Sequence, residues 1–109
     1  MTIKWVTADP LVMNGEPFCY GSRMTVRQLL EERRNGYDLT RIITDHPELR
    51  TLGVATAWAY AGEHRERYAE FLRPDGSLVG AGLTDAEAAV LPEHLRIPGI
   101  VVAGSPAQA

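Results

Sequence analysis

Residues 9–60 read DPLVMNGEPFCYGSRMTVRQLLEERRNGYDLTRIITDHPELRTLGVATAWAY. In this stretch a short extended lead-in is followed by three segments with helical spacing, and each segment has a recognisable start or stop. This order predicts a mainly α fold built on a three-helix, helix-turn-helix body. It does not resemble the surroundings of a catalytic pocket.

The first helical segment begins at Thr25, a favoured N-cap residue, and is expected to stop at Gly36, which suits the left-handed position after a helix. We expect Arg33 and Arg34 to lie in its last turn, where cations complement the helix dipole. Its apolar stripe has i, i+3, i+4 spacing and consists of Val26, Leu29 and Leu30.

The second segment starts after Asp38, another residue type favoured at N-caps. It must end near His46, because Pro47 disfavours helical conformation in the residue before it. Its apolar residues repeat the spacing of the first segment and are Leu39, Ile42 and Ile43.

The third segment opens around Arg50, with Thr51 as the expected N-cap, and no proline interrupts it before Pro74. We therefore expect a helix that continues to about Leu72. The charged run 63–67 is expected to project from the core. One broad face of this helix carries Val54, Trp58, Ala61, Tyr68 and Leu72.

The lead-in predicts a short N-terminal β arm, with extended pieces at 3–6 and 17–20 and a turn at Asn14-Gly15. An isolated two-stranded hairpin is marginal in water. The arm must therefore pack on the helices or pair with a second copy, which favours a homodimer.

The turn chemistry of Pro74-Asp75-Gly76-Ser77 places the one boundary inside the chain, between a helix-turn-helix domain at 1–73 and a small C-terminal extension at 74–109. The extension is predicted to hold a helix at 86–91, begun by a capping box at Thr84, and strands at 78–79 and 97–102. Two interpretations stay open: an arm that folds on a partner protein, or a second layer packed on the third helix.

Composition fits a single domain of 109 residues, with ordinary apolar (45%) and charged (23%) fractions. No apolar run approaches the length that spans a bilayer, and no signal-like segment is visible, so we expect a cytoplasmic protein. The lone Cys19 is expected to be a small buried hydrophobe. The net charge of −3 comes entirely from the last third, because residues 1–73 carry ten basic and ten acidic side chains.

Taken together, these motifs resemble the bacterial family known as domain of unknown function 433. The departures from its pattern are Ser22 for Thr, Met24 for Ile and His46 for Tyr. The residues that carry the resemblance are Asp9-Pro10, Gly15-Glu16-Pro17, Gly21-Ser22-Arg23-Met24-Thr25-Val26, Gly36, His46-Pro47-Glu48-Leu49 and Ala57-Trp58-Ala59-Tyr60-Ala61.

The resemblance implies a homeodomain-like or winged-helix-like helix-turn-helix fold. Many such proteins look like antitoxins of VapB type, which are encoded beside a toxin with a PIN-like nuclease fold. An antitoxin of this kind binds its own operator DNA and neutralises the toxin. The resemblance does not extend to residues 74–109.

If the second and third helices bind DNA, the start of the third enters the major groove. Arg50, Thr51 and Thr56 would then face bases or phosphates, and Arg41 would reach the DNA backbone. Arg50 is the first choice for base recognition, because arginine is the commonest reader of guanine. The alternative is that all four are solvated surface residues, and the even charge of residues 1–73 favours that alternative.

Other chemistry receives little support from the sequence. Arg23 is better placed to pair with Asp9 or Glu16 than to bind phosphate. The histidines and Cys19 lack metal-ligand spacing, and no glycine-rich phosphate loop or nucleophile–base pair is present, so we expect no metal, cofactor or catalytic residues.

The sequence therefore favours an antitoxin-like regulator that binds a PIN-like toxin and operator DNA, as a homodimer and without enzymatic activity. The competing hypothesis is a protein- or peptide-interaction module that reuses the helix-turn-helix fold without touching DNA.

Overall fold

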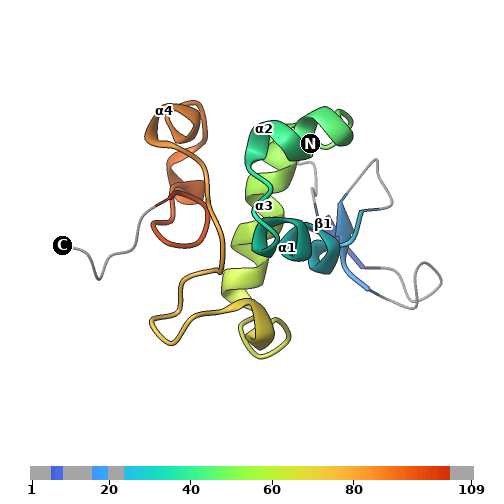
Figure 1. Cartoon of the computed structure of the whole chain (residues 1–109), viewed down its shortest axis with the longest axis vertical. Coiled ribbons are helices and arrows are strands. Elements are labelled where there is room, and N and C mark those ends of the chain that lie inside the picture. The colour runs from blue at the N-terminus through green and yellow to red at the C-terminus, as the bar shows by residue number, and fades with distance from the viewer. Residues whose placement is uncertain (1–5, 9–15, 20–23, 104–109) are drawn as a thin grey trace.

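The computed structural model describes residues 6–8, 16–19 and 24–103. Three main helices form the body, and a short N-terminal hairpin packs on the third, so the predicted mainly α fold is confirmed (Figure 1). The elements in chain order are β1 (Val6–Thr7), β2 (Phe18–Cys19), α1 (Val26–Arg34), α2 (Leu39–Asp45), α3 (Arg50–Glu63), the 3-10 helix η2 (Ala69–Phe71), α4 (Asp85–Ala88) and the 3-10 helix η3 (Glu93–Leu95).

Helix α1 begins and ends where its capping residues predict. The Thr25 hydroxyl accepts a hydrogen bond from the Gln28 backbone N–H at 3.0 Å, and the Gln28 carboxamide accepts one from the Thr25 N–H at 2.9 Å. At the other end Gly36 has φ +92°, a backbone conformation that residues with a Cβ rarely adopt. The apolar stripe is fully buried.

Helix α2 also has its predicted bounds. The Asp38 carboxylate accepts a hydrogen bond from the Arg41 backbone N–H at 2.9 Å, and the helix ends one residue before His46. Leu39 and Ile42 are buried, whereas Ile43 is half-buried.

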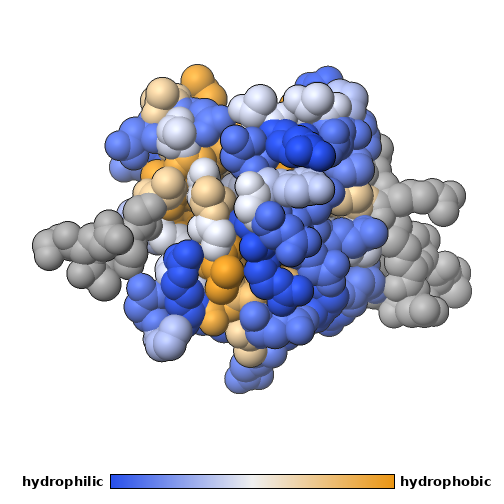
Figure 2. Space-filling view, in the orientation of Figure 1, coloured by the Kyte–Doolittle hydropathy of each residue, from blue (hydrophilic) through white to orange (hydrophobic). Residues whose placement is uncertain are grey.

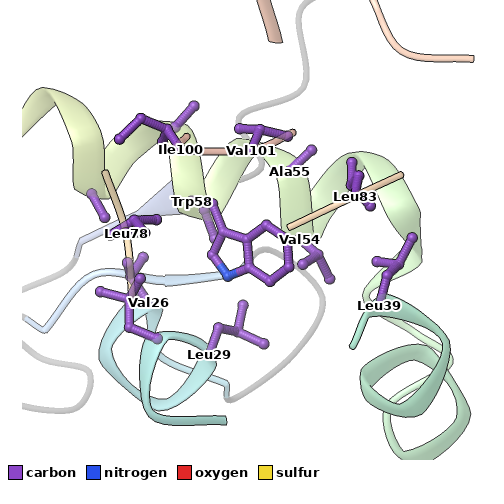
Figure 3. Close-up of a cluster of buried hydrophobic side chains, with 14 of the residues drawn as sticks. Val26, Leu29, Leu39, Val54, Ala55, Trp58, Leu78, Leu83, Ile100 and Val101 are labelled. Carbon is purple, nitrogen blue, oxygen red and sulfur yellow. The ribbon is translucent and has the colours of Figure 1, made fainter. Parts of the chain in front are cut away.

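Helix α3 is the central element of the fold, with α1 on one side and the C-terminal extension on the other (Figure 1). Trp58 has no exposed surface and lies at its middle. Figure 3 shows its indole between the α1 side chains of Val26 and Leu29 on one side and Ile100 and Val101 of the extension on the other. Burial of such a large ring supplies roughly 2–3 kcal/mol of stabilisation.

The prediction that this helix continues to Leu72 is wrong, because α3 ends at Glu63. At the next residue, His64, the ring Nδ1 lies 2.8 Å from the Tyr60 carbonyl oxygen, and the chain turns. The turn brings Tyr68 and Phe71 into the core, where they are 0% and 2% exposed. A straight helix would carry Phe71 roughly 12 Å past Glu63, out of reach of the core.

The N-terminal arm is the predicted hairpin. β1 and β2 are antiparallel, with Val6 opposite Cys19 and Thr7 opposite Phe18. Cys19 is 1% exposed, and burial raises the pKa of its thiol to about 12, so it is the expected small buried hydrophobe. The predicted turn at 14–15 lies outside the described residues.

The extension packs on the helices, the second of the two arrangements that the sequence left open. α4 begins with the predicted capping box of Thr84 and Glu87, but it is shorter than expected. The residues of the extension that join the core cluster of α1 and α3 are Leu78, Leu83, Leu91, Leu95, Ile100 and Val101.

The strands predicted at 78–79 and 97–102 are wrong, since these residues form only isolated bridges. Gly99 has φ +79°, and the backbone N–H groups of Val101 and Val102 both donate to the Ile97 carbonyl oxygen, so the chain curls there instead of extending. The boundary predicted at Pro74 stays a prediction. Among the described residues, no helix is long and apolar enough to cross a membrane.

Candidate nucleic-acid interface

The unit formed by α2, a four-residue turn and α3 is held rigidly by its turn. Leu49 is 1% exposed and anchors the turn in the core. Its backbone N–H donates to the His46 carbonyl oxygen at 3.0 Å, and His46 itself lies 3.4 Å from Glu32 of α1. The turn is therefore held by the core at Leu49 and by α1 at His46.

Arg50 is the first residue of α3 and is exposed. Its φ of 61° lies in the left-handed region, which costs an L-residue roughly 1–2 kcal/mol. The prediction of Thr51 as N-cap is wrong: Leu49 occupies that position, with helical angles and no side-chain hydrogen bond to the helix. Because the chain enters the helix directly from the turn, Thr51 already lies inside the first turn.

Arg41 is exposed on α2, one helix away from the other predicted site residues. Its Nε lies 3.3 Å from the Asp45 carboxylate, and its guanidinium lies 4.6 Å from the centre of the Tyr37 ring. These contacts hold the guanidinium at the surface of its own helix.

The two threonines are less accessible than the arginines. Both are half-buried, and the Thr56 hydroxyl donates to the Leu52 carbonyl oxygen at 2.7 Å. Beyond the first turn most residues of α3 are buried, and Val54 and Trp58 have no exposed surface. The structure thus brings Arg50 and Thr51 together at the start of α3 but leaves Thr56 farther along the helix.

The charge of this surface is balanced. Asp45 at the end of α2 and Glu48 in the turn are both exposed, so two carboxylates accompany Arg41 and Arg50. A surface of this kind supplies little general attraction for phosphates. DNA affinity at this surface therefore depends on directed contacts and not on an excess of positive charge.

A second charged cluster is not predicted by the sequence, which offers Asp9 or Glu16 as the partner of Arg23. In the described structure the Glu16 carboxylate lies 3.3 Å from Arg27 Nε and 2.6 Å from Arg67 Nη2, and Arg27 also pairs with Glu70. Arg23 and Asp9 lie outside the described residues. The partners are up to 51 positions apart in sequence, so no local spacing signals them.

The pKa of Glu16 shows which force dominates in this cluster. Burial alone would raise that pKa, but hydrogen bonds and positive charge from Arg67 and Arg27 outweigh burial and lower it. The cluster ties the segment that leads into β2 to α1 and to the turn after α3. Its arginines are engaged by carboxylates, which makes a structural role the natural interpretation.

In the part of the chain that the structure describes, no group of three His, Cys, Asp or Glu side chains could hold a metal ion.

The fold defines a class: a small, mainly helical protein with a helix-turn-helix unit and an N-terminal hairpin. Residues 6–61, just over half of the chain, match the family model described as Protein of unknown function (DUF433), and the chain belongs to that family. No curated protein and no solved structure matches the chain. The match ends within α3, so the extension lies outside it.

Proposed function

We propose that this protein is an antitoxin-like regulator, not an enzyme, that binds operator DNA through the start of α3 and also binds a protein partner such as a PIN-like toxin. The proposal rests on the exposure of Arg50 at the start of a helix whose later residues are mostly buried. In helix-turn-helix proteins the N-terminal residues of the second helix contact the base edges. The first turn of α3 is the part of that helix that is free to do so.

Two further features support DNA contact at this position. Leu49 provides no side-chain cap, so the first N–H groups of α3 stay available to a phosphate oxygen. Arg41 on α2 is exposed, so its guanidinium can exchange the Asp45 carboxylate for a phosphate of the DNA backbone. Two copies of the chain would read half-sites about 34 Å apart on a palindromic operator.

The test is a titration of the protein with the DNA upstream of its own coding sequence, at two salt concentrations. Arg50→Ala should weaken binding roughly tenfold to hundredfold, the loss expected for one arginine that contacts a base. Arg34→Ala is the matched control, because Arg34 is also exposed but lies at the end of α1, with its guanidinium over the Phe71 ring. Equal losses in both variants, or none in Arg50→Ala, would contradict the proposed interface.

The balanced charge of the surface favours a second candidate, a protein- or peptide-interaction module that does not bind DNA. Asp45 and Glu48 offset the two arginines there. A module of this kind would show no DNA binding even at low salt, where electrostatic attraction is strongest. Binding that weakens steeply as salt rises supports the regulator instead.

The protein partner is tested separately, by co-expression with the nuclease-like protein encoded next to this gene, if its fold is PIN-like. Co-purification and loss of that protein's nuclease activity in the complex are expected. A neighbouring nuclease that stays active in the presence of excess protein would contradict the antitoxin role.

A further inference from the structure

Val90 is the one large hydrophobic side chain that is exposed among the described residues, with 79% of its surface accessible. It follows α4, and the neighbouring apolar residues that are also exposed are Ala86, Ala89 and Pro92. We call these four residues the α4 knob. In Figure 2 apolar colour reaches the surface at the end of the molecule where Figure 1 places α4.

The knob is held in place from both sides and is not a frayed end. Ala88 and Leu91 flank it, and each is 4% exposed. The Arg96 guanidinium donates to the Ala89 carbonyl oxygen at 3.0 Å and to the Leu91 carbonyl oxygen at 2.9 Å, one on each side of Val90. Since these residues are already ordered, a partner that binds the knob loses little conformational entropy in doing so.

The charges around the knob are negative. Asp85 and Glu93 are exposed, and neither forms an ion pair within the described residues. Arg96 is the only basic residue after position 73, against four acidic ones, so this region has a charge of +1 − 4 = −3. The one cation is already engaged by backbone carbonyl groups.

We propose that the α4 knob is a docking surface for a protein whose binding site is a shallow apolar pocket rimmed by Lys or Arg. An apolar centre with a charged rim is the usual anatomy of a protein–protein interface, and complementary charge selects the partner. The inference deepens the proposed function, because it gives the protein partner a surface separate from the DNA-facing start of α3. The small size of the knob indicates weak, transient binding.

A second copy of the chain is a poorer occupant than a basic protein. Residues 1–73 carry ten basic and ten acidic side chains, so they offer no surplus of positive charge to the acidic rim. The copy's own extension is acidic and would be repelled.

The probe is a library of random twelve-residue peptides, selected on the immobilised full chain. Enriched peptides should combine an aromatic or branched apolar residue with two or more Lys or Arg. Their affinity should fall as salt rises, should fall at least tenfold in Val90→Asp, and should fall again in Glu93→Lys. Thr40→Asp is the matched control, because it adds the same charge at an exposed position on α2 and should leave affinity unchanged.

Several results would overturn the proposal: no enriched peptide, enriched peptides without basic residues, or equal affinity for the protein and Val90→Asp. A dimer that Val90→Asp converts to monomers would also overturn it, in favour of a second copy. An unchanged thermal midpoint should show that Val90→Asp folds, as expected for a side chain that is mostly exposed. The same variant should bind DNA normally, so the docking surface and the DNA interface can fail independently.

Discussion

Arg33 is a buried cation that has no carboxylate partner among the described residues. It is 1% exposed, its Nη1 donates to the Ile100 carbonyl oxygen, and its guanidinium lies 4.5 Å from the centre of the Trp58 ring. Burial lowers its pKa to about 10, and the positive charge of Arg73 contributes to that shift. The side chain thus joins α1, α3 and the extension, at the cost of an uncompensated charge.

Two substitutions of Arg33 test separately how its charge and its volume affect the stability of the fold. Arg33→Met keeps an unbranched chain in the space and removes the buried charge, so its free energy of unfolding should lie within about 1 kcal/mol of the parent or above it. Arg33→Ala should lose about 3 kcal/mol, because it leaves a cavity beside Trp58. Urea unfolding measures both, and an equal loss in the two variants would show that the charge itself is required.

The buried thiol of Cys19 should make the folded protein less stable at alkaline pH. The pKa of its thiol is about 12 in the folded protein, against 9.0 for a free thiol. Below pH 9 the thiol is protonated in both states; between pH 9 and 12 the unfolded chain releases the proton and the folded protein does not. The free energy of unfolding should therefore fall by up to about 1.4 kcal/mol per pH unit in that range.

Cys19→Ala provides the comparison for this pH series. The difference in stability between the protein and Cys19→Ala should shrink from pH 9 upward, because the variant lacks the titrating thiol. A constant difference would mean that the thiol is accessible to solvent in the folded state.

At the scale of the element, the start of α3 combines backbone strain with the proposed DNA contact. Arg50 has a left-handed backbone conformation, which glycine adopts without strain because it has no Cβ. Arg50→Gly should therefore be more stable than Arg50→Ala by roughly 1 kcal/mol in thermal unfolding, although both lose the guanidinium. Equal stability of the two variants would contradict the left-handed conformation.

The bounds of some helices can be predicted from the local sequence, and the bounds of others cannot. The bounds of α1 and α2 follow from local chemistry, namely the caps Thr25 and Asp38 and the stops at Gly36 and before Pro47. The end of α3 could not be predicted in this way, because no proline occurs there and Gly62 lies inside the last turn and not after it. It is decided by the distant core that Tyr68 and Phe71 enter, a tertiary effect that overrides local propensity.

In the candidate site, too, some features can be predicted from the local sequence and others cannot. Exposure of Arg41 and Arg50 follows from their polar helix positions, whereas the strain at Arg50 depends on how the turn meets α3. The burial of Arg33 had no local signal, since its position reads as an ordinary cation in a last helical turn. Only the packing of the extension over α1 makes it a core residue.

At the scale of the whole molecule, the extension completes the core. Gly80 has φ +96° and passes so close to the Arg33 backbone that a Cβ there would overlap its carbonyl group. A chain that ends at Arg73 would uncover Trp58 and lose the apolar side chains of the extension from the core cluster. We expect it to bind a hydrophobic dye and to melt without a cooperative transition. A sharp melt near that of the full chain would show that residues 1–73 fold alone.

In the proposed function, the start of α3 and the neighbouring face of α2 contact DNA, while the α4 knob remains free for protein. The most direct measurement is an NMR titration of the ¹⁵N-labelled full chain with its upstream DNA duplex. Backbone amide shifts should change most at 38–41 and 48–52 and stay unchanged at 85–93. Shifts concentrated at 85–93 or at the hairpin, or no shifts at low salt, would contradict it.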